Sequence, residues 1–597
     1  MASMRTPYVC LRCRPHTRQL SASPSPFRRA FSISASRRAN PPPSSTPRPP
    51  TAPKPTPNIK HIRKNADLYS KNCIDRNYQA LSNHPYEIQR LSDEIRQIQE
   101  TLREPQREIK QLESSIEHLM IQTTKTPSLL TDETKTQIST LRHSAQALKE
   151  KISSLTTQRA QYTKEIESLA LSLPNLTSPR TPRGDQPKLV AYLNYNPTDP
   201  PPYTTNSNHP RPSHVTIGNH LNLLNFTSSA LTTGWGWYFL TNEAALLEQA
   251  LIQYALSVAL QRGWKPVSPP SLVYSHIADA CGFQPRDAHN EQQSYAIEQS
   301  ERDIERGRPA RCLAGTAEIP LAAMYAGQEV KVPTKLVGVS RCYRAEAGAR
   351  GVDTKGLYRV HEFSKVELFG WGMPDGDNAE KGTTASDLFK EIVALQCDIL
   401  KALNLPARVL EMPAQDLGAS ASRKRDVEVL FPSRISTAST NSDNGNESGL
   451  DISTGWGEVT SASICTDYQS RRLGTRIAKK KGKGADDDAA AAAGENEKFP
   501  HTVNGTAMAV PRIIAALLEH GWDERRGTVV LPEVLSRWMG GRGEILGMEE
   551  WGVEGGGTDA YMKELDEKNA KREMEDKNVL KKRDIKNIVK EMDDEDV

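Results

Sequence analysis

Acidic residues are missing from the start of the chain. Residues 1–66 hold ten arginines and three lysines but no Asp or Glu, whereas residues 67–597 carry a net charge of −9. The net charge of +4 for the whole chain therefore hides a slightly acidic larger part. A basic protein that coats DNA is excluded, because phosphate neutralisation requires a broad excess of Lys and Arg.

Long apolar runs and paired cysteines are also absent. No stretch approaches the ~18 consecutive apolar residues that a spanning helix needs, which excludes an integral membrane protein. Of the eight cysteines, only Cys10 and Cys13 are spaced Cys-x-x-Cys, and no second pair or His-x₃₋₅-His partner completes a zinc site. The pattern favours single reduced thiols in a cytosol-like compartment, and a metal or disulfide is the minor alternative.

The acid-free N-terminus predicts a targeting segment. Residues 1–38 are rich in Arg and Ser, which is typical of a mitochondrial transit peptide and places the protein in the mitochondrial matrix. An ordinary disordered basic tail is the alternative, and an additional cytosolic form begun at a downstream start stays open. Residues 39–60 form a Pro-rich linker, with nine prolines between positions 41 and 57, and we expect it to stay extended and unpacked.

A two-helix coiled coil is predicted within residues 61–173. Apolar residues recur at steps of three and four from Ile88 to Leu119 and again from Ile138 to Leu173. The break at residues 126–128 joins two helices of similar length, so they are expected to pair antiparallel as an arm of about 50–60 Å. Pro105 falls on the apolar seam, where its missing N–H predicts a kink.

Residues 174–545 have the mixed texture of an α+β domain. Two polar stretches within it, 434–453 and 479–498, cannot bury enough surface to order themselves and are predicted to be mobile surface loops. The charged C-terminal tail, residues 546–597, mixes Lys, Glu and Asp with few apolar anchors. We interpret it as a solvated helix or disorder, with a docking tail as the alternative.

The segment from Ser340 to Glu367 is the most informative. It predicts a strand, a Gly-containing loop and a second strand, with Arg344 and Glu346 on one face of the first strand. Arg359, Phe363 and Glu367 would share a face of the second. Arginines bind phosphates, a carboxylate accepts a hydrogen bond from an exocyclic amine, and an aromatic ring stacks on a base. A nucleotide would therefore fill this face. A solvated hairpin with incidental ion pairs explains the spacing equally well.

This segment resembles motif 2 of class II aminoacyl-tRNA synthetases, and specifically that of the seryl-tRNA synthetase family. Further matches follow in the expected order over about residues 61–545: the exit from the arm at 173–176, the entry to the core at 214–218 and 236–240, motif 1 at 263–270, a Thr-x-Glu element at 315–320, an ATP and metal segment at 458–461 with 467–472, and motif 3 at 504–512. The resemblance implies a class II antiparallel β-sheet catalytic core flanked by helices, preceded by a coiled-coil arm that binds tRNA. Motif 1 implies a homodimer.

The resemblance also implies a reaction. L-Serine and ATP give seryl-adenylate, and the seryl group then moves to the 3′ end of tRNA(Ser). In the family, Thr316 and Glu318 would take the ammonium group, and Glu367 and Thr506 the serine hydroxyl. The implied serine-binding residues are Thr316, Ala317, Glu318, Arg344, Glu367 and Thr506.

The nucleotide end follows from the same resemblance. Arg344 would hold the α-phosphate and the serine carboxylate, and Arg344 and Arg512 are the expected catalytic residues. Glu346 would accept from adenine N6, with Phe363 and Arg512 on either side of the base. The implied ATP-binding residues are Arg344, Ala345, Glu346, Arg359, Val360, Phe363, Glu458, Val459, Thr460, Ser461 and Arg512. Glu458 and Ser461 offer hard oxygen ligands for Mg²⁺.

Two features bear on the alternatives. Residues 84–173 hold twelve Lys and Arg against thirteen Asp and Glu, so the arm is not basic and a few placed cations, such as Lys149, Lys151, Arg159 and Lys164, would contact tRNA. A catalytically inactive paralogue acting as an RNA- or protein-binding module is the other reading. It should have lost charged site residues, yet each position is suitably filled.

Overall fold

The computed structural model describes residues 48–49, 51–126, 131–204, 211–283, 292–346, 356–375, 383–437, 450–478 and 499–546. The predicted transit peptide (residues 1–38), the 479–498 stretch and residues 547–597 of the tail lie outside this part. Within it, no helix is long and apolar enough to cross a membrane.

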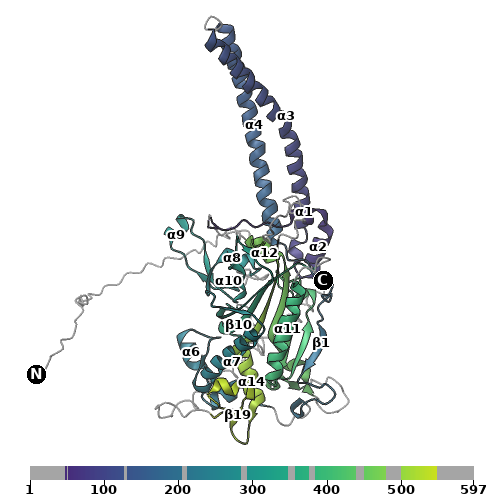
Figure 1. Cartoon of the computed structure of the whole chain (residues 1–597), viewed down its shortest axis with the longest axis vertical. Helices are drawn as coiled ribbons and strands as arrows, with labels where there is room; N and C mark the ends of the chain where they lie inside the picture. The colour runs from purple at the N-terminus through teal and green to yellow at the C-terminus, as the bar shows by residue number, and fades with distance from the viewer. Residues whose placement is uncertain are drawn as a thin grey trace, which may run out of the picture. The chain divides into compact units, whose positions relative to one another are not determined.

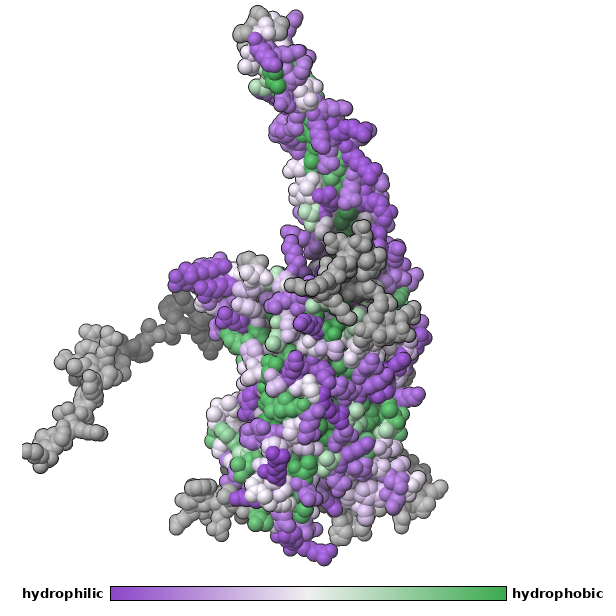
Figure 2. All heavy atoms as spheres, in the orientation of Figure 1, coloured by the Kyte–Doolittle hydropathy of each residue, from purple (hydrophilic) through white to green (hydrophobic). Residues whose placement is uncertain are grey.

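The predicted arm is present. Helices α3 (His84–Lys125) and α4 (Asp132–Ser172) pair along their length (Figure 1). Their seam buries the residues of the predicted pattern, including Ile88, Leu91 and Leu102 of α3 and Ile138 and Ile166 of α4. Figure 2 shows hydrophilic side chains over most of the arm and hydrophobic ones in a narrow strip along it. Helix pairing therefore rests on this one apolar stripe.

Pro105 does not interrupt α3. The helix continues through it, with the ring buried in the seam, and Figure 1 shows α3 curving without a break. Proline lacks the N–H that would bond the carbonyl four residues earlier, which here belongs to Thr101. Thr101 is exposed, so water can hydrogen-bond its carbonyl instead.

The linker prediction is wrong for the residues after position 50. Thr56 N–H donates to the Arg471 carbonyl at 2.9 Å, and Pro53 lies against Gly327 and Gly474 of the sheet domain. Prolines fix φ in advance, so this extended segment loses little entropy when it packs. Residues 51–58, which we call the strap, lead directly into α1 (Ile59–Lys64) and α2 (Ala66–Asp75).

An eight-stranded sheet organises the second domain, in the order β1-β11-β12-β15-β17-β10-β9-β4. All neighbours are antiparallel except β4 and β9, which confirms the predicted α+β class. The strands are β1 Lys188–Leu193, β4 Lys265–Val267, β9 Thr334–Tyr343, β10 Glu362–Gly372, β11 Ala407–Glu411, β12 Arg423–Leu430, β15 Trp456–Thr466 and β17 His501–Ala509.

Three helices cover one face of the sheet. They are α7 (Asn242–Gln261), α11 (Ala385–Ala402) and α14 (Val510–Gly521), and they enclose the main hydrophobic core (Figure 1). The opposite face is covered only in part, by α8 (Ser275–Ala280), α10 (Glu318–Ala323) and α12 (Tyr468–Leu473) around a second cluster. Polar side chains of the central strands therefore lie on this second face.

Short elements complete the domain. The remaining α-helices of the described residues are α5 His214–His220, α6 Phe226–Thr232, α9 Glu301–Glu305 and α15 Glu533–Ser536. Small sheets pair β2 (Leu224–Asn225) with β3 (Phe239–Leu240), β8 (Glu329–Val330) with β16 (Arg476–Ile477), β5 (Leu272–Tyr274) and β6 (Ala296–Ile297) with β7 (Arg311–Leu313), and β18 (Trp522–Asp523) and β20 (Glu544–Ile545) with β19 (Thr528–Val530).

The 434–453 stretch is ordered at both ends. Strands β13 (Ser436–Thr437) and β14 (Leu450–Asp451) pair there, and only residues 438–449 lie outside the described part. The prediction of a wholly unstructured loop is therefore wrong at its base, where backbone pairing compensates for the lack of apolar side chains.

The base of the arm is hydrogen-bonded to the sheet domain. The side-chain amide of Asn175 donates to the carbonyls of Ser420 and Cys465, both at 2.8 Å. Arg472 donates to the carbonyls of Leu171 and Leu173 at the end of α4. These bonds satisfy backbone groups where the helix ends and fix the joint.

Candidate active site

A row of polar side chains crosses four central strands. Glu367 of β10 lies opposite Thr506 of β17, and Ser461 of β15 lies opposite Asp426 of β12. Ala462 pairs with Gly505, so Ser461 and Thr506 lie next to each other in the antiparallel ladder. The sheet register thus brings together residues that are 139 positions apart in the sequence.

The predicted hairpin is shorter than the sequence indicated. Strand β9 ends at Tyr343 and β10 begins at Glu362, so Arg344, Glu346 and Arg359 follow or precede the strands and do not alternate along them. Glu346 has φ +48°, a left-handed conformation that cannot continue a strand. Arg344 N–H still donates to the His361 carbonyl at 2.9 Å, which keeps the two ends side by side.

A buried histidine anchors the return of this hairpin. His214 Nε2 accepts from the N–H of Leu357 at 3.0 Å, and its Nδ1 is 2.9 Å from Glu519 Oε1, which Tyr358 also contacts at 2.8 Å. A Cβ at Gly356 would lie 2.2 Å from His214 Nε2, so only glycine fits there. Burial raises the pKa of Glu519, but His214 and Tyr358 outweigh it and the net pKa is lowered.

The end of the row that is predicted to hold the nucleotide contains six of the predicted side chains. The Arg344 guanidinium lies 5.3 Å from the centre of the Phe363 ring, and Glu346 pairs with Arg359. Arg512 donates through Nε to the Tyr358 carbonyl at 2.9 Å, and its other end approaches the Glu458 carboxylate at 3.6 Å. The guanidinium of Arg512 is thereby fixed, whereas Glu346 and Arg359 neutralise each other.

Glu458 is held in its charged form. Burial raises its pKa, but Lys424, Arg512 and Arg344 together lower the pKa of this carboxyl well below its usual range. The pKa of Asp426, which lies opposite Ser461, is shifted in the other direction: burial and the charge of Glu458 raise it. Its Oδ2 accepts from Lys424 at 2.7 Å, while its Oδ1 is buried without a partner among the described residues.

The end that is predicted to hold the amino acid is built around Glu318, at the start of α10. Its Oε1 accepts from the amides of Gln469 at 2.6 Å and Asn504 at 2.8 Å. Burial raises the pKa of Glu318 to about 8, and the Glu367 charge acts in the same direction. A buried carboxyl with a raised pKa can release its proton when an ammonium group binds beside it.

Lys365 also belongs to this end, although the sequence analysis did not single it out. Its ammonium donates to Thr316 Oγ1 at 2.7 Å and pairs with Glu367 Oε2 at 2.8 Å. The side chain is 7% exposed. The signal that could have found it is alternation, since residues 363, 365 and 367 of one strand share a face.

Four predicted residues do not turn polar groups toward this row. Ala317 is fully buried, Val459 packs in the main core, and Val360 packs with Cys342 and Phe363. The Thr460 hydroxyl donates to the Thr506 carbonyl. Any contact of these residues with a ligand would therefore come from their backbone.

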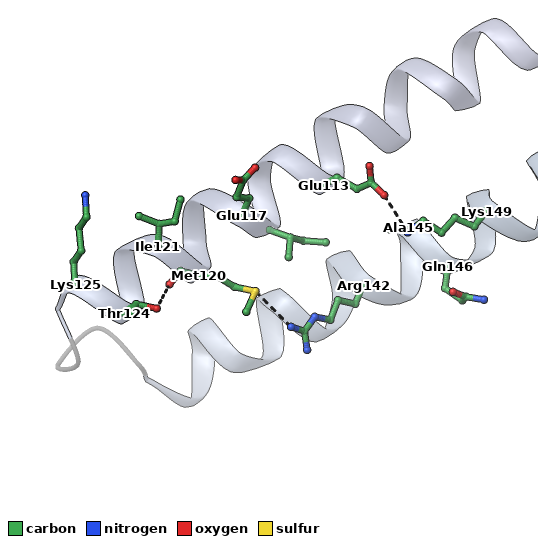
Figure 3. Close-up of a pocket in the computed structure, with 11 residues that line it drawn as sticks. Glu113, Glu117, Met120, Ile121, Thr124, Lys125, Arg142, Ala145, Gln146 and Lys149 are labelled. Carbon is green, nitrogen blue, oxygen red and sulfur yellow. Dashed lines mark hydrogen bonds and ion pairs between the residues drawn. The ribbon is translucent and has the colours of Figure 1, made fainter.

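The described arm carries a separate apolar groove near its tip. It encloses about 680 Å³ between α3 and α4, with Ile116, Met120 and Ala145 among its lining residues (Figure 3). Lys149, one of the predicted tRNA contacts, pairs there with Glu113 at 3.0 Å. This groove lies on the arm and is separate from the row of polar side chains on the sheet.

The sheet order, the motif 2 hairpin and the arginine at the start of α14 define a class II aminoacyl-tRNA synthetase core, and residues 299–521 match the family profile "tRNA synthetase class II core domain (G, H, P, S and T)". Residues 58–177 match "Seryl-tRNA synthetase N-terminal domain". The chain belongs to the seryl-tRNA synthetase family.

Full-length relatives support this assignment. The chain is 38% identical over 456 residues to the mitochondrial serine–tRNA ligase of Saccharomyces cerevisiae, covering 76% of this chain and 90% of that protein. The mitochondrial serine–tRNA ligase of Schizosaccharomyces pombe is 37% identical over 480 residues, covering 80% and 87%. Among solved structures, seryl-tRNA synthetase from Pyrococcus horikoshii complexed with ATP has a TM-score of 0.62 at 26% identity, covering 83% of this chain and 100% of that one.

Proposed function

We propose that this chain is a serine–tRNA ligase that activates L-serine with ATP and transfers the seryl group to the 3′ end of tRNA(Ser). The observation that carries the proposal is that two buried carboxyls, those of Glu318 and Glu367, lie near each other and near Arg344 in a class II core. One acid is suited to an ammonium group and the other, with Thr506, to a hydroxyl.

Activation requires positioning and charge neutralisation. The serine carboxylate oxygen attacks the α-phosphorus of ATP, the P–O bond to the β-phosphate breaks, and pyrophosphate leaves. Arg344, near the Phe363 ring, would neutralise the charge on the α-phosphate as this occurs. Arg512, fixed by the Tyr358 carbonyl, would lie against the adenine.

Mg²⁺ is implied by the family, and the residues present fit it. Glu458 is charged, Ser461 adds a hydroxyl, and Asp426 turns an unpartnered buried oxygen to the same region. Such hard oxygens suit Mg²⁺ held by one or two carboxylates and by phosphate oxygens. When bound, the ion would neutralise phosphate charge.

The arm would hold the tRNA, and the protein would act as a homodimer. Arm side chains reach RNA by shape and backbone contacts, which a few placed cations provide. For the dimer, α7 exposes Leu246 (50%) and Leu260 (46%) next to β4, an edge strand of the sheet. Exposed leucines on a helix beside a sheet edge are residues that a second subunit can cover.

We also place the enzyme in the mitochondrial matrix. Support comes from the acid-free residues 1–38 and from relatives that are named as mitochondrial enzymes.

Pyrophosphate exchange tests the proposal directly. The purified chain with ATP and labelled pyrophosphate should exchange label in the presence of serine and hardly at all with alanine or threonine. Aminoacylation of tRNA(Ser) should follow. A well-folded protein with no exchange under any condition would instead support the inactive paralogue.

A further inference from the structure

Two carboxyls and one lysine share the buried amino-acid end of the site. Glu318 and Glu367 each have less than a tenth of their surface exposed, and Lys365 is equally buried. Burial raises the pKa of Glu318, and the nearby charge of Glu367 opposes a second negative charge and acts in the same direction. A single serine ammonium cannot neutralise both acids, so the site needs a second cation of its own.

Lys365 supplies a cation that forms its ion pair with Glu367. Its ammonium lies 2.8 Å from Glu367 Oε2, and the same oxygen accepts from the Thr506 hydroxyl at 3.2 Å. Among the described residues, none hydrogen-bonds Glu367 Oε1. One oxygen of Glu367 is therefore held in place, and the other is left for a ligand hydroxyl.

The same ammonium orients Thr316. Lys365 donates to Thr316 Oγ1 at 2.7 Å, so that hydroxyl accepts from the lysine. Among the described residues, the donors to the carboxyl of Glu318, two residues away, are the neutral amides of Gln469 and Asn504. The one acid without a hydrogen-bonded cation is therefore the one expected to meet the substrate ammonium.

We propose that Lys365 is a positioning residue that divides the two acids of the site, reserving Glu318 for the ammonium group of serine and fixing Glu367 to receive its hydroxyl. The inference rests on the proposed function and adds a specificity determinant to it. Discrimination against alanine then depends on Lys365, because a hydroxyl is selected only if its acceptor is charged and held in place.

The test compares Lys365→Met with Lys365→Arg in serine-dependent pyrophosphate exchange. We expect Lys365→Met to raise the KM for serine about 10- to 100-fold, to change the KM for ATP less than twofold, and to reduce the preference for serine over alanine at least tenfold. Lys365→Arg keeps the charge and should restore much of the preference. Lys401→Met, on the exposed side of α11, is the matched control.

A second variant separates specificity from folding. Lys365→Met leaves Glu367 buried without its cation and can destabilise the protein. The double variant Lys365→Met/Glu367→Gln removes both charges, so its melting temperature should recover while the preference for serine stays lost. A folded Lys365→Met variant with unchanged KM and unchanged preference for serine overturns the inference. Absence of exchange in the wild-type protein would overturn the proposed function instead.

Discussion

At the residue scale, the site is a set of buried charges whose neighbours decide which of them stay ionised. Glu458 is kept charged by Lys424, Arg512 and Arg344, whereas burial favours the protonated form of Glu318. The same residue type therefore serves opposite purposes at the two ends of one site. Substitutions of Arg344 and Glu318 should therefore have different effects, the first on adenylate formation and the second on how stability depends on pH.

Replacing Arg344 by Ala should abolish adenylate formation and leave the fold intact. Arg344 follows β9 and is only partly buried, so its loss costs little stability, but its charge would act on the α-phosphate during activation. Pyrophosphate exchange should fall at least about 100-fold. Near-normal exchange in a variant with an unchanged melting curve would show that the motif 2 assignment is wrong.

Replacing Glu318 by Gln should change how stability depends on pH. The carboxyl has a pKa of about 8 in the folded protein and about 4.3 when unfolded, so between these values the native state binds the extra proton. Wild-type stability then falls as pH rises from about 5 to 8. Glutamine cannot titrate, so its advantage in melting temperature over wild type should grow by at least about 2 °C across this window. Parallel profiles for the two proteins would contradict the raised pKa.

Sequence reasoning reached many of the charged site residues but missed Lys365 and the neutral side chains that hold the acids in place. Arg344, Glu367 and Arg512 stand within motifs whose spacing is informative. Gln469 and Asn504 bond Glu318 through the fold alone, across 151 and 186 positions. The sequence also did not show which predicted site residues are buried. Val459 belongs to the segment expected to bind ATP, but its side chain packs in the core.

At the element scale, periodicity predicted helices better than it predicted where strands end. The heptads place both arm helices within a few residues, because a seam of 40 residues repeats the same signal. The motif 2 hairpin offers no such repetition. Its strands end where Glu346 takes a left-handed conformation and where His361 bonds the Arg344 carbonyl, both of which are tertiary effects.

The arm can be shortened without damaging its base. Glu113 pairs with Lys149 and Met120 contacts Arg142, which places position 106 opposite position 156. Replacing residues 106–156 by a short Gly/Ser turn keeps the cluster of Ile88, Leu91 and Ile166 at the joint. We expect serine-dependent pyrophosphate exchange within about twofold of wild type and tRNA charging reduced at least about 100-fold.

The charge pattern of the arm provides the control for this deletion. Lys151→Ala/Lys164→Ala in the full-length arm should weaken charging less than the deletion does, and tRNA binding should depend less steeply on salt than in the wild-type protein, because fewer counterions are released. Charging that survives the deletion would overturn the assignment of the arm to tRNA. Loss of exchange in the folded deletion variant would show that the arm supports the catalytic domain.

At the whole-molecule scale, exposed apolar residues predict how copies of the chain associate. Leu246 and Leu260 are 14 residues apart on α7, about four turns, and so lie on one side of it. Leu246→Lys/Leu260→Lys should convert a dimer into a monomer in sedimentation equilibrium, because buried ammonium groups oppose association. Leu189→Lys, at the opposite edge of the sheet, should leave the dimer intact. A wild-type monomer would refute the dimer.

The boundary between targeting and folded sequence should fall just before the strap. Residues 1–45 contain no acid, whereas residues 51–58 lie on the sheet domain through Thr56 and Pro53. A fluorescent reporter fused to residues 1–47 should therefore enter mitochondria, since a basic segment without acids is what the import machinery recognises. The contribution of the strap to stability is tested with two deletions of the purified protein. Deleting residues 2–47 should leave the melting temperature unchanged. Deleting residues 2–57 should lower it by several degrees, because the backbone bond to Arg471 and the packing on Gly327 and Gly474 are lost. Equal melting temperatures for the two deletions would show that the strap adds nothing to the fold, and a reporter that stays diffuse in the cytosol would refute the targeting assignment.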